Sequence, residues 1–263
     1  MKKMGILLLV LVLLLAACTQ DNQTEAAADN AAVTEESAAA DAGDSSVLVM
    51  ATNASFPPYE FYEGGEIVGI DAEIAAKIAE KLGMELRIDD MNFDSIINAV
   101  STGKADIGMA GMSVTEDRLE NVNFSESYAT GIQSIIVRED SEITGPEDLE
   151  GKMIGVQLAT TGDIYVADEF GEEHVDRYNK GADAIMSLTQ GKVDAVIIDN
   201  APAQEYVRVN EGLKVLDTEY AEEDYAIAFA KDNEALLAQV NEALQALIED
   251  GTVQSIIDKY IQP

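Results

Sequence analysis

Hydrophobic and polar positions repeat with two different periods along the chain from residue 47 onward. Short apolar or alternating runs predict strands at residues 47–52, 84–89, 105–110, 152–157, 174–179 and 193–199. Apolar residues three or four positions apart predict helices at residues 71–82, 95–100, 162–170 and 182–189, with Asp94 as the N-cap of the second. Strands that alternate with helices over short loops predict βαβ units. The fold class is therefore α/β with mainly parallel sheets.

Two stretches of similar pattern lie about ninety residues apart, at 101–111 and 189–199. In each, the predicted helix ends at a glycine, and the strand that follows ends at polar residues. The repetition indicates two similar lobes rather than one sheet. Ligands of open α/β sheets bind beyond the carboxyl ends of the strands, so the segment from Gly111 to Ser113 and the residue Asp199 are the expected site.

The first residues have the layout of a secretory signal peptide. Lys2 and Lys3 precede an apolar run that ends at Leu15, and Ala16 and Ala17 follow, so we assign residues 1–17 to the signal. The run is shorter than the roughly 20 residues of a membrane span, which makes a transmembrane anchor the weaker alternative.

Cys18 is the single cysteine of the chain and comes directly after Leu15-Ala16-Ala17. This quartet resembles a bacterial lipobox, in which the cysteine is acylated and becomes the mature N-terminus. The alternative is an idle small residue, but a free thiol is a liability in an oxidising compartment. Residues 18–46 continue with Ala, acidic and small polar residues, so we expect a lipidated cysteine followed by a disordered acidic linker.

Acidic residues dominate the composition of the 263-residue chain, whose net charge is −34. Without Lys2 and Lys3 the chain has 14 basic and 50 acidic residues, a net charge of −36. This charge excludes nucleic acid as a partner. A soluble charged surface is the simplest interpretation, and a field that steers cationic ligands is the alternative. Metal-ligand spacings and phosphate-binding glycine loops are missing, so we expect no metal and no cofactor.

Seven stretches in order resemble the extracellular amino-acid-binding proteins of ABC importers, known as solute-binding protein family 3. They lie at 51–61, 68–83, 103–118, 123–128, 148–163, 191–200 and 249–260. The resemblance implies a two-lobed, periplasmic-binding-protein-like clamshell, with lobe 1 at 47–128 and 227–263 and lobe 2 at 133–221. It also implies that the chain crosses between the lobes at 128–132 and 222–226.

The resemblance further implies an amino-acid clamp. Arg118 would hold the ligand carboxylate with a bidentate guanidinium, together with Gly111, Ser113 and the backbone of Thr161. Asp199 would hold the ammonium group. Each residue has a structural alternative: Arg118 as part of a capped helical turn, Thr161 as a helix cap, and Asp199 as the N-cap of a helix that begins at residue 200.

The side-chain end of the pocket is less defined. Phe56 and Phe93 match positions that sandwich the ligand in the family, although either could belong to the core. Asn53 and Gln157 stand where relatives often carry charges, with Ile198 beside them, which favours a neutral polar amino acid, or else a cationic one. Tyr59 and Glu60 are additional candidates of unknown orientation, and His174 is expected to be an isolated strand residue.

These features predict a monomeric, lipid-anchored binding protein on the extracytoplasmic face of the cell membrane, which delivers an amino acid to an ABC permease. An enzyme is one alternative, because cyclohexadienyl dehydratases resemble the same fold family, but they need an added acid or base. A ligand sensor acting through a separate partner is the other. The full clamp and the anchor favour transport without catalysis.

Overall fold

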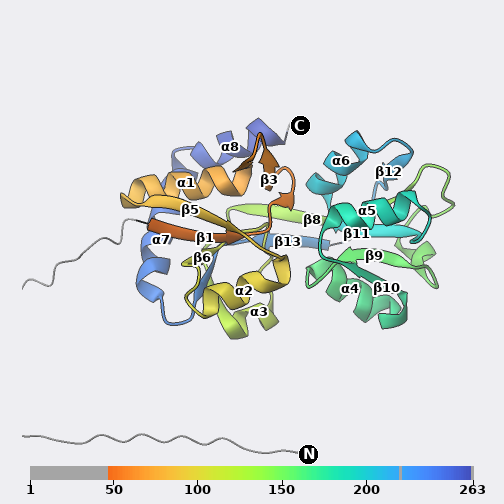
Figure 1. Cartoon of the computed structure of the whole chain (residues 1–263), viewed down its shortest axis with the longest axis horizontal. Helices are drawn as coiled ribbons and strands as arrows, with labels where there is room; N and C mark the ends of the chain where they lie inside the picture. Colours follow the sequence, from red (N-terminus) through yellow and green to blue (C-terminus); the bar gives the residue numbers. More distant parts are fainter. Residues whose placement is uncertain (1–46, 219–220, 262–263) are drawn as a thin grey trace, which may run out of the picture. The chain divides into compact units, whose positions relative to one another are not determined.

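The computed structural model describes residues 47–218 and 221–261. The predicted signal peptide, Cys18 and the linker lie outside the described residues. The described part contains two larger sheets flanked by helices and one small sheet, β2-β3-β4 (Figure 1). The strands are β1 Val47–Thr52, β2 Ser55–Phe56, β3 Glu60–Glu63, β4 Glu66–Val68, β5 Glu85–Asp90, β6 Ile107–Gly108, β7 Val122–Phe124, β8 Ala129–Arg138, β9 Ile154–Gln157, β10 Val175–Tyr178, β11 Ala195–Asp199, β12 Leu213–Val215, β13 Ala221–Tyr225 and β14 Ala228–Ala230.

The helices lie mostly between consecutive strands, as the sequence pattern predicts. They are α1 Ile70–Leu82, α2 Phe93–Ser101, α3 Glu116–Asn121, α4 Thr161–Phe170, α5 Gly181–Thr189, α6 Asn200–Val209, α7 Glu234–Glu249 and α8 Thr252–Tyr260, with 3-10 turns η1 Pro146–Leu149 and η2 Glu172–His174. No helix of these ranges is long and apolar enough to cross a membrane.

The first sheet has the strand order β5-β1-β6-β14-β7 and defines lobe 1. Its inner strand β1 is apolar at nearly every position because both faces are covered. Leu48 and Met50 join the core cluster that contains α1 and α7 residues, whereas Val49 and Ala51 pack on the opposite face against the cluster that contains α2 residues. This alternation follows from the two-residue period of a strand.

The second sheet has the order β10-β9-β11-β8-β12, with β13 also paired to β8, and defines lobe 2. In β11, Val196 and Ile198 belong to one core cluster and Ala195 and Ile197 to another. The strand is therefore buried on both faces, and its end, Asp199, is at the edge where the loops begin.

Both sheets are mixed, which corrects the expectation of mainly parallel sheets. Strand β1 runs parallel to β5 and β6, and β9 runs parallel to β10 and β11. Strands β14, β8, β12 and β13 form the antiparallel pairs. The parallel pairs come from the βαβ units that the sequence indicates. The antiparallel pairs come from strands that return after a longer excursion of the chain, which local periodicity does not record.

Two paired strands connect the sheets. Strand β8 pairs with β13 in antiparallel register from Ala129↔Tyr225 to Gln133↔Ala221. Gly131 lies in this ladder, where a Cβ atom would come within 2.4 Å of the Tyr225 ring, so only glycine leaves room for the ring. The ladder overlaps the predicted crossings at 128–132 and 222–226, whose limits stay a prediction together with those of the lobes.

Three local predictions are wrong. Asp94 lies inside the first turn of α2, whose N-cap is Asn92. The strand expected at 105–110 is limited to β6, because only Ile107 and Gly108 pair with neighbouring strands. His174 lies in the turn η2 before β10 rather than in the strand.

Candidate functional site

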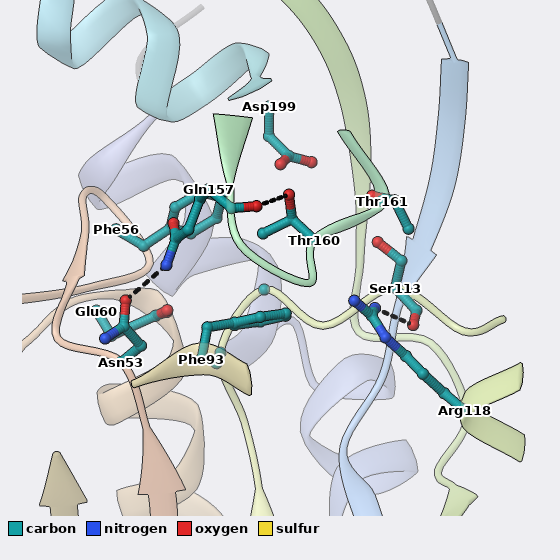
Figure 2. A pocket seen from close by; sticks show the side chains of 12 residues that line it. Asn53, Phe56, Glu60, Phe93, Ser113, Arg118, Gln157, Thr160, Thr161 and Asp199 are labelled. Carbon is teal, nitrogen blue, oxygen red and sulfur yellow. Dashed lines mark hydrogen bonds between the residues drawn. The ribbon is translucent and has the colours of Figure 1, made fainter. Parts of the chain in front are cut away.

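A cavity lies at the carboxyl ends of β1, β6, β9 and β11. All nine residues expected at the ligand site line it, and Glu60, Ala110 and Thr160 line it as well (Figure 2). The complete lining is Asn53, Phe56, Glu60, Phe93, Ala110, Gly111, Ser113, Arg118, Gln157, Thr160, Thr161 and Asp199. Loops at the carboxyl ends of strands in both sheets thus contribute to one cavity.

Arg118 reaches the cavity from α3. Thr115 caps this helix by accepting a hydrogen bond from the Arg118 backbone, while the Arg118 side chain is only 7% exposed. Its guanidinium donates to the carbonyl oxygens of Ser113 and Ala159 over 2.8 and 3.0 Å. The capped turn of the alternative interpretation therefore exists, and the side chain still points into the cavity.

The charges around Arg118 favour its protonated form, which can bind an anion. Burial lowers the pKa of Arg118, and the charges of Glu223 and Asp199 oppose this effect. A guanidinium stays protonated in proteins, so the cavity contains a fixed positive charge. The Phe93 ring lies beneath it, with the guanidinium carbon 5.3 Å from the ring centroid.

Backbone and hydroxyl groups surround this positive charge. Gly111 has φ +51°, and a Cβ atom there would come within 2.8 Å of the Phe56 ring, which explains the glycine. Thr161 is the first residue of α4, where backbone N–H groups have no partner within the helix and attract anions. The cap of α4 is Thr160 rather than Thr161, so the capping alternative for Thr161 is wrong.

Asp199 occupies the opposite side of the cavity, at the end of β11 (Figure 2). It stands at the N-cap position of α6, yet its side chain makes no capping hydrogen bond. Its carboxylate instead accepts a hydrogen bond from the Tyr225 hydroxyl. Burial raises the pKa of Asp199 to about 7, which the Tyr225 hydrogen bond partly counteracts. A cation beside Asp199 would therefore stabilise its ionised form.

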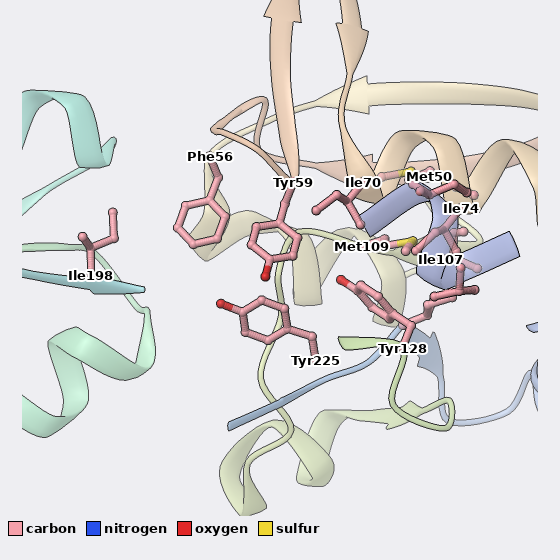
Figure 3. Packing of buried hydrophobic residues seen from close by; sticks show 14 of the residues in the cluster. Met50, Phe56, Tyr59, Ile70, Ile74, Ile107, Met109, Tyr128, Ile198 and Tyr225 are labelled. Carbon is pink, nitrogen blue, oxygen red and sulfur yellow. The ribbon is translucent and has the colours of Figure 1, made fainter. Parts of the chain in front are cut away.

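Aromatic residues and amides form the remaining walls. Phe56 is buried within the core cluster of Tyr59 and Ile198 (Figure 3). Phe93 packs against the α2 core, so both rings belong to the core and to the cavity. The Gln157 amide donates to the Asn53 side-chain oxygen over 3.0 Å. This bond joins the end of β9 in the second sheet to the loop after β1 in the first.

Tyr59 does not line the cavity, but Glu60 does. Tyr59 is buried behind Phe56, and its ring lies 5.2 Å from that of Tyr225 in an edge-on arrangement (Figure 3). The Glu60 side chain is 0% exposed, and neither of its carboxylate oxygens has a hydrogen-bond partner among the described residues. Burial and the nearby Asp71 raise its pKa well above the usual range.

Glu223 supports the anion side of the cavity and was missed by sequence reasoning. Its carboxylate accepts hydrogen bonds from the hydroxyls of Ser113, Thr161 and Tyr165 over 2.6–2.8 Å and from the Gln133 amide over 3.3 Å. A signal for it exists: in the acidic run 222–224 followed by Tyr225, strand alternation places Glu223 on the same face as the buried tyrosine.

The cavity offers a cation at one side and a carboxylate at the other, with apolar rings between them. This arrangement suits a zwitterion whose carboxylate and ammonium groups need separate partners. No group of three or more His, Cys, Asp or Glu side chains able to hold a metal occurs in residues 47–218 and 221–261.

The fold and the site together define a two-lobed solute-binding protein. Residues 48–263 match the family model of bacterial extracellular solute-binding proteins, family 3, and the chain belongs to this family. Its relatives are binding proteins rather than enzymes, and this chain is also a binding protein.

Relatives with described ligands cover most of the chain. The arginine-binding extracellular protein ArtP of Bacillus subtilis is 34% identical over 81% of this chain and 85% of its own. An ancestral arginine-binding protein bound to glutamine is 38% identical, with a TM-score of 0.79 over 83% of this chain and 99% of that one. The arginine-, lysine-, histidine-binding protein ArtJ of Geobacillus stearothermophilus is 34% identical, with a TM-score of 0.79 over 82% of this chain and 95% of that one.

Proposed function

We propose that this protein captures a cationic α-amino acid, arginine in the first place, outside the cytoplasm and delivers it to an ABC importer. The observation that carries the choice of ligand is Glu60, a fully buried carboxylate without a hydrogen-bond partner that lines the same cavity as Arg118 and Asp199. The ionised form of a carboxyl group buried in this way is costly unless a cation meets it.

Arg118, Asp199 and Glu60 would each bind a different polar group of the ligand. Arg118, with the Ser113 and Thr161 groups beside it, would bind the α-carboxylate, and Asp199 would bind the α-ammonium group. Phe56 and Phe93 would enclose the aliphatic part of the side chain, and a guanidinium could stack on such rings. Glu60, with the amides of Asn53 and Gln157, would then accept hydrogen bonds from the guanidinium.

This assignment changes the order of ligands expected from the sequence. Asn53 and Gln157 alone favour a neutral polar amino acid, whereas Glu60 adds a carboxyl group that a cation can ionise at that end of the cavity. The relatives named for arginine support the cationic choice, and the ancestral relative bound to glutamine supports a neutral amide as the second ligand. Glutamate would place two carboxylates together without a cation and should bind worst.

We also propose that the protein is held at the membrane as a monomer through acyl chains on Cys18, after removal of residues 1–17, with residues 18–46 as a tether. The family supports an extracytoplasmic location. The lipid anchor rests on the sequence pattern around Cys18.

A calorimetric titration of the domain from residue 47 against arginine, lysine, glutamine and glutamate tests the ligand proposal. Arginine should bind most tightly, glutamine more weakly, and glutamate should be the weakest of the four. Tightest binding of glutamate would overturn the assignment of Glu60. Failure of all four to bind, in a sample shown by circular dichroism to be folded, would overturn the amino-acid function itself.

A further inference from the structure

Glu60 and Asp71 together have more carboxylate oxygens than there are hydrogen-bond donors to them. Asp71 of α1 is fully buried, and one of its oxygens accepts hydrogen bonds from the Gly111 N–H over 2.8 Å and from the Tyr128 hydroxyl over 2.9 Å. Its other oxygen and both oxygens of Glu60 have no donor among the described residues. The backbone N–H of Asp71 donates to the carbonyl oxygen of Tyr59 over 2.9 Å, which places Asp71 beside Glu60, and the two carboxyl groups act on each other.

Two carboxylates in contact are both acceptors, so one proton between them is needed to make a hydrogen bond. We propose that Glu60 and Asp71 share this single proton in the free protein, that a cationic ligand side chain expels it, and that a neutral polar side chain leaves it in place. This inference rests on the proposed function, since it concerns the end of the cavity assigned to the ligand side chain.

The proton belongs on Glu60 in the free protein. Asp71 receives two hydrogen bonds that stabilise its charge, whereas Glu60 receives none. The pKa values agree with this division: burial raises the pKa of Asp71 only to about 6, against the effect of its two donors, and raises that of Glu60 well above its usual range. Glu60 therefore donates its O–H to Asp71.

The charges that act most strongly on Glu60 in the described part of the chain favour its protonation. The titratable groups whose charges act on Glu60, or on which Glu60 acts, come from β5, α1, β11, α6 and the segments around β2 and β8. All are acids or phenols: Asp71, Asp90, Asp199, Tyr59, Tyr128 and Tyr206. Arg118 is assigned to the ligand carboxylate, so a guanidinium on the ligand side chain would supply the cation for Glu60.

The two classes of ligand would use Glu60 in different protonation states. With arginine, the Glu60 O–H bond breaks, the proton passes to the solvent, and the carboxylate accepts hydrogen bonds from the guanidinium N–H groups. With glutamine, Glu60 stays neutral and can donate its O–H to the ligand's amide oxygen. One residue would thus recognise both a cationic and a neutral side chain, and pH would set the preference between them.

Asp199 also exchanges protons, and the comparison of two ligands removes its contribution. Because its pKa is about 7, a ligand ammonium should release about half a proton from it at about pH 7. Arginine and glutamine carry the same ammonium group, so Asp199 contributes equally to both titrations. The difference between their proton counts belongs to the Glu60–Asp71 pair.

Calorimetric titration of the wild-type protein at about pH 7 in phosphate, imidazole and Tris buffers measures these counts, because the observed heat varies with the ionisation enthalpy of the buffer. Arginine should release about 1.5 protons and glutamine about 0.5. The affinity for arginine should rise with pH more steeply than that for glutamine, by up to about tenfold per pH unit.

The variant Glu60→Gln removes the titrating group and keeps its size. It should bind arginine more weakly and release only the Asp199 contribution, about half a proton. If this variant does not fold, or if glutamine binds too weakly to titrate, the number of protons released when arginine binds the wild-type protein still tests the proposal. A count near 0.5 overturns the shared proton and leaves arginine binding intact. Failure of arginine to bind overturns the proposed function instead.

Discussion

The guanidinium of Arg118 donates a hydrogen bond to the carbonyl oxygen of Ala159 over 3.0 Å. Arg118 follows the first sheet's β6 along the chain, and Ala159 follows β9 of the second sheet. The arginine assigned to the ligand carboxylate therefore already connects the two lobes. Any ligand that binds Arg118 does so at the boundary between them, and we expect affinity and closure of the lobes to depend on the same side chains.

Replacement of Arg118 by lysine should weaken arginine binding by about tenfold, a loss of about 1.4 kcal/mol, because the charge remains but an ammonium lacks the two parallel donors of a guanidinium. Titration calorimetry measures the change. Arg87→Lys is the matched control, because Arg87 is exposed and pairs with Asp89 at the surface. Equal affinities in both variants would contradict the role of Arg118.

Replacement of Asp199 by alanine should weaken binding by about thirtyfold or more, because the ligand ammonium would lose its partner and losing one partner of a buried charge pair costs roughly 2–5 kcal/mol. At saturating ligand, the variant should close less completely, because contacts to both lobes favour the closed state and lobe 2 would lose its charged contact with the ligand. Small-angle scattering detects closure as a smaller radius of gyration. Wild-type affinity together with full compaction would show that Asp199 has only a structural role at the start of α6.

Replacement of Glu223 by glutamine should weaken ligand binding by about tenfold, a loss of about 1.4 kcal/mol. The amide nitrogen of glutamine would face hydroxyl groups that now donate to a carboxylate, so Ser113 and Thr161 would lose their fixed orientation. Glu222→Gln is the control, since Glu222 is the exposed neighbour in β13. Equal affinities in the two variants, measured by calorimetry, would show that Glu223 is not needed to orient the site.

The free protein should become less stable as the pH rises from about 4 to about 7. Burial raises the pKa values of Asp71 and Asp199 to about 6 and about 7. An acid whose pKa is raised by folding binds more protons in the folded state, so its favourable contribution is present below its unfolded pKa and is lost as the pH passes the folded value. The loss should be on the order of a few kcal/mol.

Urea denaturation at a series of pH values measures this slope. Below about pH 4, surface carboxylates whose pKa values are lowered by hydrogen bonds, such as Asp148 and Glu172, should produce the opposite trend. Asp199→Asn should flatten the slope around pH 7. A free energy of unfolding that increases steadily from about pH 5 to about pH 8 would contradict the assignment.

Replacement of Cys18 by serine should release the protein from the membrane or leave it unprocessed, because a serine offers no thiol for acylation. Mass spectrometry of the mature N-terminus in membrane fractions identifies the modification in the wild type. An unmodified Cys18 in those fractions would rule out the lipid anchor.

The strands and helices of the βαβ units could be predicted because each records its burial in a local period. Strands β1 and β11 are apolar on both faces, and α1 carries its buried residues at helical spacing before Gly83. The antiparallel partners of β8 could not be predicted in this way. Their pairing depends on contacts between residues about sixty to ninety-six positions apart, for which a single sequence holds no local signal.

The residues of the candidate site could likewise be predicted only in part. Residues at strand ends and helix starts, such as Ser113 and Asp199, were found because the fold class fixes where ligands bind. Glu60 and Glu223 were not assigned roles because both depend on the direction of a side chain in a short strand and on groups far away in sequence. In a chain with 50 acidic residues, composition does not separate two buried acids from the exposed ones.

The pairing of β8 with β13 brings the two ends of the predicted second lobe, 133–221, together, because Gln133 and Ala221 are partners in the ladder. Ala129 and Tyr225 are direct partners in the ladder, so their Cα atoms are only about 5 Å apart. A short turn that joins these two positions would close the first lobe into a continuous chain, at the small entropic cost of a short loop. If the predicted limits hold, the second lobe is an insertion into the first whose two ends meet at one place in the fold.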